Sequence, residues 1–178
     1  MVYVILIAGT IGFLALLAPD LCRLARRRRL AALFSSVGYS AVLTALVLQV
    51  TSFRPAGPLG LRVAAAAASA AFAVLLVYSV LLEIPLRSRS PAAGAPQLYT
   101  AGTYRLSRHP GLLWFLLMQL CLNAIYLDGS FVAVSLVLAL GDLGLVAVQD
   151  LCIFPLTLPG YAAYKLRVPF LFPRFRTG

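Results

Sequence analysis

Five apolar stretches dominate this sequence, and each is long enough to cross a lipid bilayer. They lie at residues 2–18, 30–50, 63–82, 111–127 and 131–153. With a rise of about 1.5 Å per residue, an α-helix of this length extends roughly 25 to 35 Å, which matches the hydrocarbon core of a membrane. The sequence therefore predicts an all-α, polytopic membrane protein with five transmembrane helices.

Composition excludes a water-soluble globule. Hydrophobic residues make up 62% of the chain and charged residues 11%, whereas about a quarter of the residues in a soluble protein are charged. Most of the surface of the folded chain must then face lipid. Because 178 residues is a single-domain length, we expect one integral membrane domain over residues 1–178.

The basic residues are distributed unevenly between the two ends of the predicted helices. Thirteen of the fifteen Lys and Arg residues follow the first apolar stretch, lie between the third and fourth, or follow the fifth. The positive-inside rule then predicts a cell-membrane protein with its N-terminus outside and its C-terminus in the cytosol. Topology explains the formal charge of +10, so no nucleic-acid partner is expected. The arginines at 26–29 serve this topology or contact anionic membrane lipids.

Cysteine and histidine are too sparse for a metal centre or a disulfide framework. Cys22, Cys121 and Cys152 are far apart in the sequence and lack the Cys-x-x-Cys spacing of a zinc site. His109 is the single histidine of the chain. We therefore expect no metal, and three thiols that pack in or beside the helices.

The polar chemistry is concentrated on the predicted cytosolic side. Three residues, 128–130, join the last two apolar stretches, so these two helices must be antiparallel neighbours. By contrast, residues 86–110 and 155–178 hold most of the polar groups outside the helices. A binding or active site is therefore expected at the cytosolic end of the helices.

An arginine, a histidine and a proline stand together where the fourth apolar stretch begins. Pro110 suits the first turn of a helix, and Arg108 and His109 come directly before it. A helix N-terminus presents free N–H groups and the positive end of the helix dipole. This combination predicts an anionic ligand, such as a carboxylate or a phosphate.

Two motifs at this end occur in a defined order and spacing. The first is Gly-x-Tyr-x-x-x-Arg-His-Pro at residues 102–110. The second comprises Gln149, Asp150, Tyr161, Tyr164, Val168, Pro169 and Pro173. Over residues 98–173 the pair resembles the isoprenylcysteine carboxyl methyltransferase and phospholipid methyltransferase superfamily, in which two glutamates occupy the positions of Gln149 and Asp150.

The resemblance implies a membrane methyltransferase that uses S-adenosylmethionine. Its substrate would be membrane-embedded or amphiphilic, with an isoprenylcysteine-type carboxylate or a lipid head group, and would enter from the bilayer. The cofactor would lie between the cytosolic ends of the last two helices and a C-terminal tail folded over them. The residues placed around the cofactor by this resemblance are Tyr104, His109, Pro110, Tyr161, Tyr164 and Pro169.

The same resemblance implies catalytic roles for Asp150, Arg108 and Arg167. Asp150 would hold the ammonium of the cofactor, orient an amine nucleophile or offset local positive charge. Arg108 or His109 would meet the methionine carboxylate, and Arg167 would bind a carboxylate substrate through its planar guanidinium. Methyl transfer itself needs positioning and a water-poor pocket more than proton relays.

Three positions depart from the family pattern and leave other functions open. Leu112 replaces a tyrosine, Trp114 a glycine and Gln149 a glutamate. One alternative is a non-catalytic ligand-binding or partner protein with the same fold. Another is an NADPH-dependent enzyme of the sterol-reductase type, which has a related Arg-His motif, although this chain is much shorter than that group and has no extra basic cluster for a 2′-phosphate.

Simpler structural roles are also open for the same side chains. His109 can be an interfacial residue that hydrogen-bonds a loop carbonyl. Tyr161 and Tyr164, with nearby phenylalanines, can form an aromatic belt at the membrane surface.

Two acids lie inside or at the end of apolar stretches. Asp142 is near mid-bilayer, where a carboxyl group needs a partner or a cavity. We expect it to hydrogen-bond Gln119 or Asn123 of the neighbouring helix, the alternative being a polar group in a substrate tunnel. Glu83 is expected to pair with Arg87 one turn later, and it is given no catalytic role.

Overall fold

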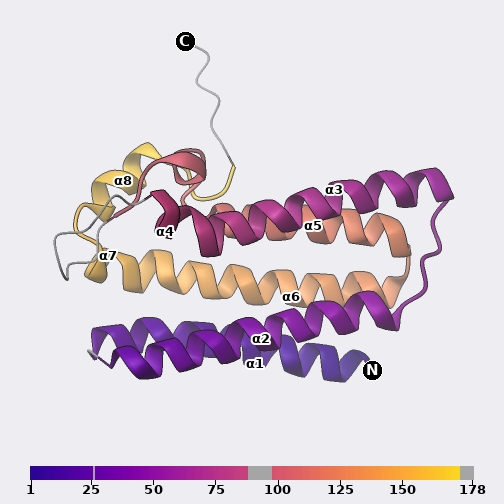
Figure 1. Ribbon diagram of the computed structural model, residues 1–178, viewed down its shortest axis with the longest axis horizontal. Helices are drawn as coiled ribbons and strands as arrows, with labels where there is room; N and C mark the ends of the chain where they lie inside the picture. The colour runs from indigo at the N-terminus through magenta and orange to yellow at the C-terminus, as the bar shows by residue number, and fades with distance from the viewer. Residues whose placement is uncertain (26, 88–97, 173–178) are drawn as a thin grey trace, which may run out of the picture.

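The computed structural model describes residues 1–25, 27–87 and 98–172, and their regular structure is all-α (Figure 1). The long helices are α1 (Val2–Leu24), α2 (Arg28–Ser52), α3 (Leu59–Val77), α5 (Pro110–Tyr126) and α6 (Gly129–Val148). A π-helical turn, η1 (Tyr78–Leu82), joins α3 to the short helix α4 (Glu83–Arg87). A second, η3 (Gln149–Ile153), joins α6 to α7 (Phe154–Thr157). The 3₁₀ turn η2 (Gly102–Arg105) and helix α8 (Tyr161–Arg167) complete the described structure.

Four helical segments are long and apolar enough to cross a membrane. They are Val2–Cys22, Arg29–Ser52, Leu59–Leu86 and Gly129–Thr157. The fourth predicted stretch, 111–127, forms α5, an apolar helix that is shorter, at 17 residues. The chain thus has the helices of a multi-pass membrane protein, with four candidate spans where the sequence predicted five.

The long helices lie side by side as a bundle with α6 in the middle (Figure 1). The hairpin α1–α2 packs against one side of α6, and α5 packs against the other with α3 beside it. The short elements η2, α7 and α8 gather at one end of the bundle, next to α4 and the start of α5 (Figure 1). Residues 98–109 and 158–172 at this end are called the cap below.

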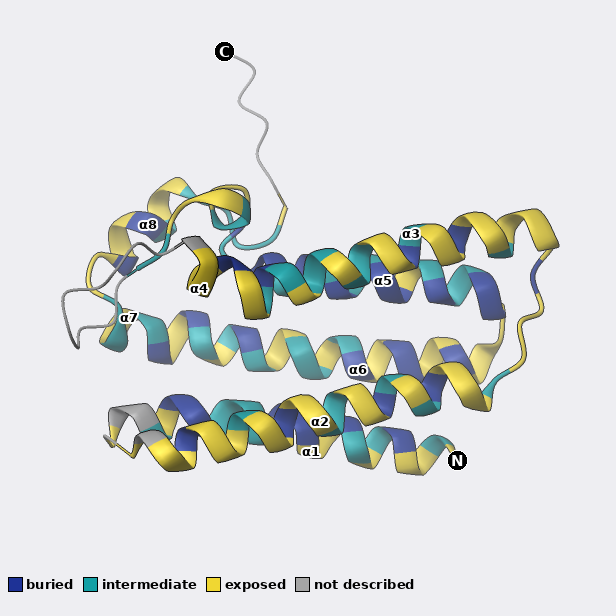
Figure 2. Ribbon diagram, in the orientation of Figure 1, coloured by how far each residue is buried: buried dark blue, intermediate teal, exposed yellow. Residues whose placement is uncertain are grey.

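The outer faces of the bundle are largely exposed (Figure 2), and many of the exposed residues are large and apolar. Leu14, Val63, Val74, Leu120 and Leu140 are each more than half exposed. Apolar patches of this extent are rare on soluble proteins. They are the expected surface of helices that face hydrocarbon.

A hydrogen-bonded chain of polar side chains crosses the interior of the bundle. Gln119 Nε2 donates to Gln49 Oε1 at 3.2 Å, and Gln49 Nε2 donates to Ser135 Oγ at 2.8 Å. The Ser135 hydroxyl then donates to Asn123 Oδ1 at 2.9 Å. These bonds tie α2, α5 and α6 together where a lone polar group would have no water to satisfy it.

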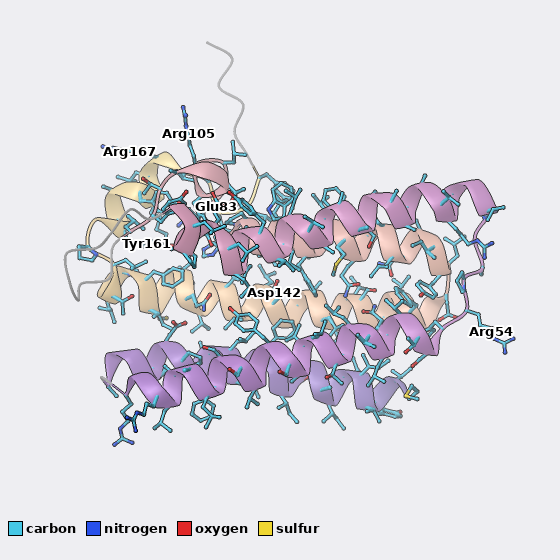
Figure 3. All side chains as sticks on the ribbon, viewed as in Figure 1. Arg54, Glu83, Arg105, Asp142, Tyr161 and Arg167 are labelled. Atoms are coloured by element: carbon cyan, nitrogen blue, oxygen red, sulfur yellow. The ribbon has the colours of Figure 1, made fainter. Side chains whose placement is uncertain are left out.

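The predicted hydrogen bond of Asp142 to Gln119 or Asn123 is wrong. Both amides are engaged with Gln49 or Ser135, and Ser135 lies two helical turns closer to the α5–α6 hairpin than Asp142. Among the described residues Asp142 has no hydrogen-bond partner, and it projects from the middle of α6 (Figure 3). The alternative role of Asp142, as a polar group that lines a substrate tunnel, stays a prediction.

Two glycines allow α1 and α2 to approach closely. A Cβ atom on Gly12 would lie 2.7 Å from Val42 Cγ2 and 2.9 Å from the Val42 backbone nitrogen. A Cβ atom on Gly38 would lie 2.7 Å from the Leu16 side chain. Because the obstacle at Gly12 includes backbone, a side-chain rotation cannot relieve the clash.

We predict that Gly12→Ala destabilises the bundle by about 1 to 3 kcal/mol, the usual cost of overpacking. Gly144→Ala is the matched control, because a Cβ atom there meets nothing within 4 Å. Unfolding in detergent titrated with sodium dodecyl sulfate measures both. Equal stability of Gly12→Ala and Gly144→Ala would contradict the close helix contact.

Candidate functional site

Both helices that lead to the cap contain a π-helical turn at the same end of the bundle. In η1 the Glu83 N–H bonds to the Tyr78 carbonyl, five residues earlier. An α-helical Glu83 would instead bond to the carbonyl of Ser79. That carbonyl is left to another donor, and the Tyr104 hydroxyl of the cap donates to it at 3.0 Å.

The second π turn repeats this arrangement on α6. In η3 the Phe154 N–H bonds to the Gln149 carbonyl. The Asp150 carbonyl, its partner in an α-helix, accepts instead from Lys165 Nζ of α8 at 3.4 Å. Isolated π turns occur frequently at functional sites, and here each one attaches a part of the cap to the bundle.

The centre of the site is the Asp150 carboxylate, which is 2% exposed. Arg108 Nη1 donates to its two oxygens at 2.7 and 3.1 Å. His109 Nε2 lies 3.0 Å from Oδ1, and the Tyr161 hydroxyl donates to Oδ1 at 2.6 Å. Lys165 Nζ is 2.8 Å from Oδ2. A carboxylate with this many donors is held in the ionised form and in one orientation.

The charges around Asp150 do not cancel. Arg108 and Lys165 are cations that share one carboxylate. Burial lowers the pKa of His109, and its hydrogen bond to Asp150 opposes that shift without overcoming it. His109 is therefore neutral at pH 7, and since a carboxylate accepts only, Nε2 carries the hydrogen. The cluster keeps an excess positive charge, which favours an anionic ligand.

The tyrosines of the cap act as hydrogen-bond donors. Burial raises the pKa of Tyr104, Tyr161 and Tyr164, the last to about 12. All three phenols therefore stay protonated at neutral pH. Tyr164 donates to the Tyr104 backbone carbonyl at 2.5 Å, which joins α8 to η2.

The two sequence motifs also meet through their backbones. The Arg108 N–H donates to the Pro169 carbonyl at 3.0 Å, and the Ser107 hydroxyl donates to the Phe170 carbonyl at 3.1 Å. The centroid of the Phe170 ring lies 5.0 Å from the centroid of the His109 ring and 5.6 Å from the Arg108 guanidinium carbon. Residues 169 and 170 of the C-terminal tail thus lie against the first motif.

Two pockets open within the cap. The larger, about 480 Å³, is within the size range of small-molecule sites. It is lined by Leu98, Thr100, Arg105, Gly160, Ala163, Tyr164, Arg167 and Val168. The smaller, about 230 Å³, is lined by Arg108, Lys165, Leu166, Arg167, Val168, Pro169 and Phe170.

Arginines contribute to the polar lining of both pockets. Arg167 borders both pockets, and Arg105 borders the larger one. In Figure 3 the side chains of Arg105 and Arg167 extend from the cap away from the helix bundle. The Arg108 Nε atom, beside the smaller pocket, is buried without a hydrogen-bond partner. A ligand oxygen that reaches Arg108 would satisfy this atom.

The structure brings most of the predicted site residues together. Asp150, Arg108, His109 and Tyr161 form one network, and Tyr104 contacts Tyr164. Pro169 receives the Arg108 N–H, and Pro110 is fully buried as the first residue of α5. Arg167 makes no described contact with Asp150 and lines the pockets instead. Pro173 lies outside the described residues.

The two simpler readings of these side chains are wrong. His109 bonds to a carboxylate rather than to a loop carbonyl. Tyr161 and Tyr164 are buried inside the cap, so they are not an exposed aromatic belt. Both outcomes follow from α8 folding back onto η3, which sequence periodicity does not reveal.

Sequence reasoning missed Lys165, Arg105 and the position of Glu83. Lys165 lies four residues after Tyr161 on α8, a spacing that places both on one helix face. Glu83 is fully buried, and its described partners are Thr103 and Tyr99. The predicted pairing with Arg87 involves a side chain that lies outside the described residues.

The residues at the three positions that depart from the family pattern are each buried or in contact with a neighbouring helix. Leu112 is buried, and Trp114 stacks on Phe72 of α3 at 6.2 Å between ring centroids. Gln149 Nε2 donates to Asp20 Oδ2 at 2.8 Å, away from the Asp150 network. Gln149 thus links η3 to α1 near its C-terminal end.

Comparison with protein-family models, with curated proteins and with solved structures gives no match to this chain.

We predict that Asp150→Asn destabilises the protein by roughly 3 to 5 kcal/mol, because it leaves the buried Arg108 guanidinium without a counter-charge. The matched control is Asp128→Asn. Asp128 caps α6 by accepting from the Phe131 N–H, and asparagine caps equally well. Thermal or sodium dodecyl sulfate unfolding in detergent compares the two variants. Similar stability for both would show that the Asp150 cluster does not hold the cap.

Proposed function

We propose that this protein transfers a methyl group from S-adenosylmethionine to an amphiphilic substrate at the membrane surface. The observation that carries the proposal is the meeting of two distant motifs on one carboxylate. Arg108 and His109 of the first motif, and Tyr161 of the second, all bond to Asp150. Methyltransferases of the superfamily that the sequence resembles have both motifs.

The chemistry of the cap suits the two ends of the cofactor. The unpartnered Arg108 Nε and the excess positive charge around it favour the methionine carboxylate. Tyr104, His109, Pro110, Tyr161, Tyr164 and Pro169 are proposed to position the cofactor. When bound, it supplies a sulfonium whose methyl group is open to in-line displacement. The chain then contributes orientation and exclusion of water.

The substrate is proposed to carry an anionic or polar head and a hydrocarbon tail. Arg167, with Arg105 nearby, offers a planar guanidinium to a carboxylate or a lipid head group in the larger pocket. The tail would remain in the bilayer beside the exposed apolar helix faces. A carboxylate nucleophile needs no general base, which suits a site whose histidine is already engaged by Asp150.

Asp150 is proposed to act by orientation. Its oxygens already accept from Arg108, His109, Tyr161 and Lys165. It therefore sets the direction of the two cations and offsets one of their charges. The same saturation of Asp150 also favours the second candidate function, a binding protein with this fold that does not turn its ligand over.

We predict that the full-length protein in detergent binds S-adenosylmethionine and its demethylated product, measured by calorimetry. His109→Ala and Tyr164→Ala should each weaken binding by about 1 to 3 kcal/mol, the cost of a lost buried hydrogen bond. Leu156→Ala is the control, because this side chain is 78% exposed and lines neither pocket. If both variants stay folded and bind the cofactor with unchanged affinity, the cofactor site lies elsewhere in the protein. If the wild-type protein binds neither compound, the proposed function is wrong.

We further propose five spans with an outer N-terminus and the cap in the cytosol. At about 1.5 Å per residue, the 17 residues of α5 extend roughly 25 Å, and α5 runs alongside α3 within the bundle (Figure 1). The basic residues of the described cap include Arg105, Arg108, Lys165 and Arg167. Their concentration favours the cytosolic side.

Labelling of single cysteines in intact cells tests this topology. Ala56→Cys, in the exposed α2–α3 connection, should react with a membrane-impermeant maleimide, and Leu166→Cys in the cap should not. Both variants need a background in which Cys22, Cys121 and Cys152 are replaced. The reverse labelling pattern would overturn both the topology and the cytosolic position of the site.

A further inference from the structure

Glu83 is a fully buried carboxylate that the proposed chemistry does not use. It is the first residue of α4, directly after the π turn η1, and its exposure is 0%. A buried carboxyl group is costly unless it is hydrogen-bonded. Its partners therefore show what holds it in place.

The donors to Glu83 come from the cap. The Thr103 N–H donates to Oε1 at 2.8 Å, and the Thr103 hydroxyl donates to Oε2. The Tyr99 hydroxyl lies 3.5 Å from Oε1. Gly102 has φ of +58°, and a Cβ atom there would collide with Glu83 Oε1. The backbone of η2 is therefore fitted closely around this carboxylate.

The contacts continue from Glu83 to the wall of the larger pocket. Thr103 is followed by Tyr104, whose hydroxyl donates to the Ser79 carbonyl in η1. The Tyr104 carbonyl accepts from the Tyr164 hydroxyl at 2.5 Å. Tyr164 lines the 480 Å³ pocket. A continuous path of hydrogen bonds and adjacent residues thus links Glu83 to the pocket through residues of η2.

We propose that Glu83 is a positioning residue for the candidate site, acting through Thr103 to set the place of Tyr104 and, through it, of Tyr164. Where the inference concerns ligand binding, it rests on the proposed function. Where it concerns the geometry of the cap, it stands on its own. Asp150 orients charged groups in the same cap, whereas the described donors to Glu83 are neutral.

Because the described donors to Glu83 are neutral, two substitutions at this position give different expected results. Glu83→Leu removes every acceptor. Glu83→Gln keeps one oxygen for the Thr103 N–H, and its amide can donate to the Thr103 hydroxyl. If Glu83 positions η2 through these bonds, glutamine should preserve the geometry and leucine should not. Thr103→Val removes the hydroxyl alone and provides an independent test if Glu83→Leu does not fold.

The cap geometry is measured by pulsed electron–electron double resonance on the full chain in nanodiscs. Spin labels are placed at Leu59 and Leu106, which are exposed at 68% and 50%. Leu59 begins α3 at the far end of the bundle, and Leu106 follows η2 in the cap. The native cysteines are replaced in this background.

A single narrow distance distribution is expected for the parent protein and for Glu83→Gln. Glu83→Leu and Thr103→Val should broaden or shift it, although helicity by circular dichroism stays the same. An unchanged distribution in both Glu83→Leu and Thr103→Val overturns the inference, and so does a Glu83→Gln variant that broadens as much as Glu83→Leu.

Calorimetry with S-adenosylmethionine provides the second readout. Glu83→Leu should weaken binding by roughly 10-fold or more, the effect of losing a hydrogen bond to a charged group, and Glu83→Gln should restore most of it. Unaltered affinity in Glu83→Leu would also overturn the inference. If the parent protein binds no cofactor, the proposed function fails, and the spin-label distances alone decide the role of Glu83.

Discussion

The requirement that every buried backbone group finds a hydrogen-bond partner shapes both the bundle and its cap. Long helices satisfy this requirement internally over most of their length. Each of the π turns η1 and η3 leaves one carbonyl without its usual α-helical donor. The cap side chains of Tyr104 and Lys165 donate to these two carbonyls. The cap is therefore attached to the bundle where the helices deviate from α geometry.

Two buried carboxylates reinforce these attachments in different ways. Asp150 receives two cations, a neutral imidazole and a phenol, so it organises charge. The described donors to Glu83 are an amide and hydroxyl groups, so it organises backbone. Together they place an electropositive site against the end of an apolar bundle. That position is consistent with the ligand proposed above, which has a charged head and a hydrocarbon tail.

Much of the fold and part of the site were predictable from local signals. Apolar stretches of membrane length indicated the long helices, and Pro110 marked the first residue of α5. The resemblance of the two motifs to the methyltransferase superfamily, rather than a local signal, implied that the segments of Arg108, His109 and the two tyrosines would meet. The prediction for Asp142 was wrong because the amides of α5 bond to Ser135 and Gln49 instead. Asp142 lies two helical turns farther from the α5–α6 hairpin than Ser135, and the contact of α5 with Gln49 of α2 forms only when the helices pack.

The sequence by itself determined the class of the protein and the end of the bundle where its polar chemistry lies, because hydrophobic length and charge placement act locally along the chain. Tertiary structure alone decided that Lys165 joins the Asp150 network, that Glu83 binds Thr103, and that Gln149 turns to Asp20. Each of these contacts joins segments that only folding brings together. The contacts at the π turns are of the same kind, because the carbonyls left open in η1 and η3 accept from Tyr104 and Lys165 only in the assembled fold.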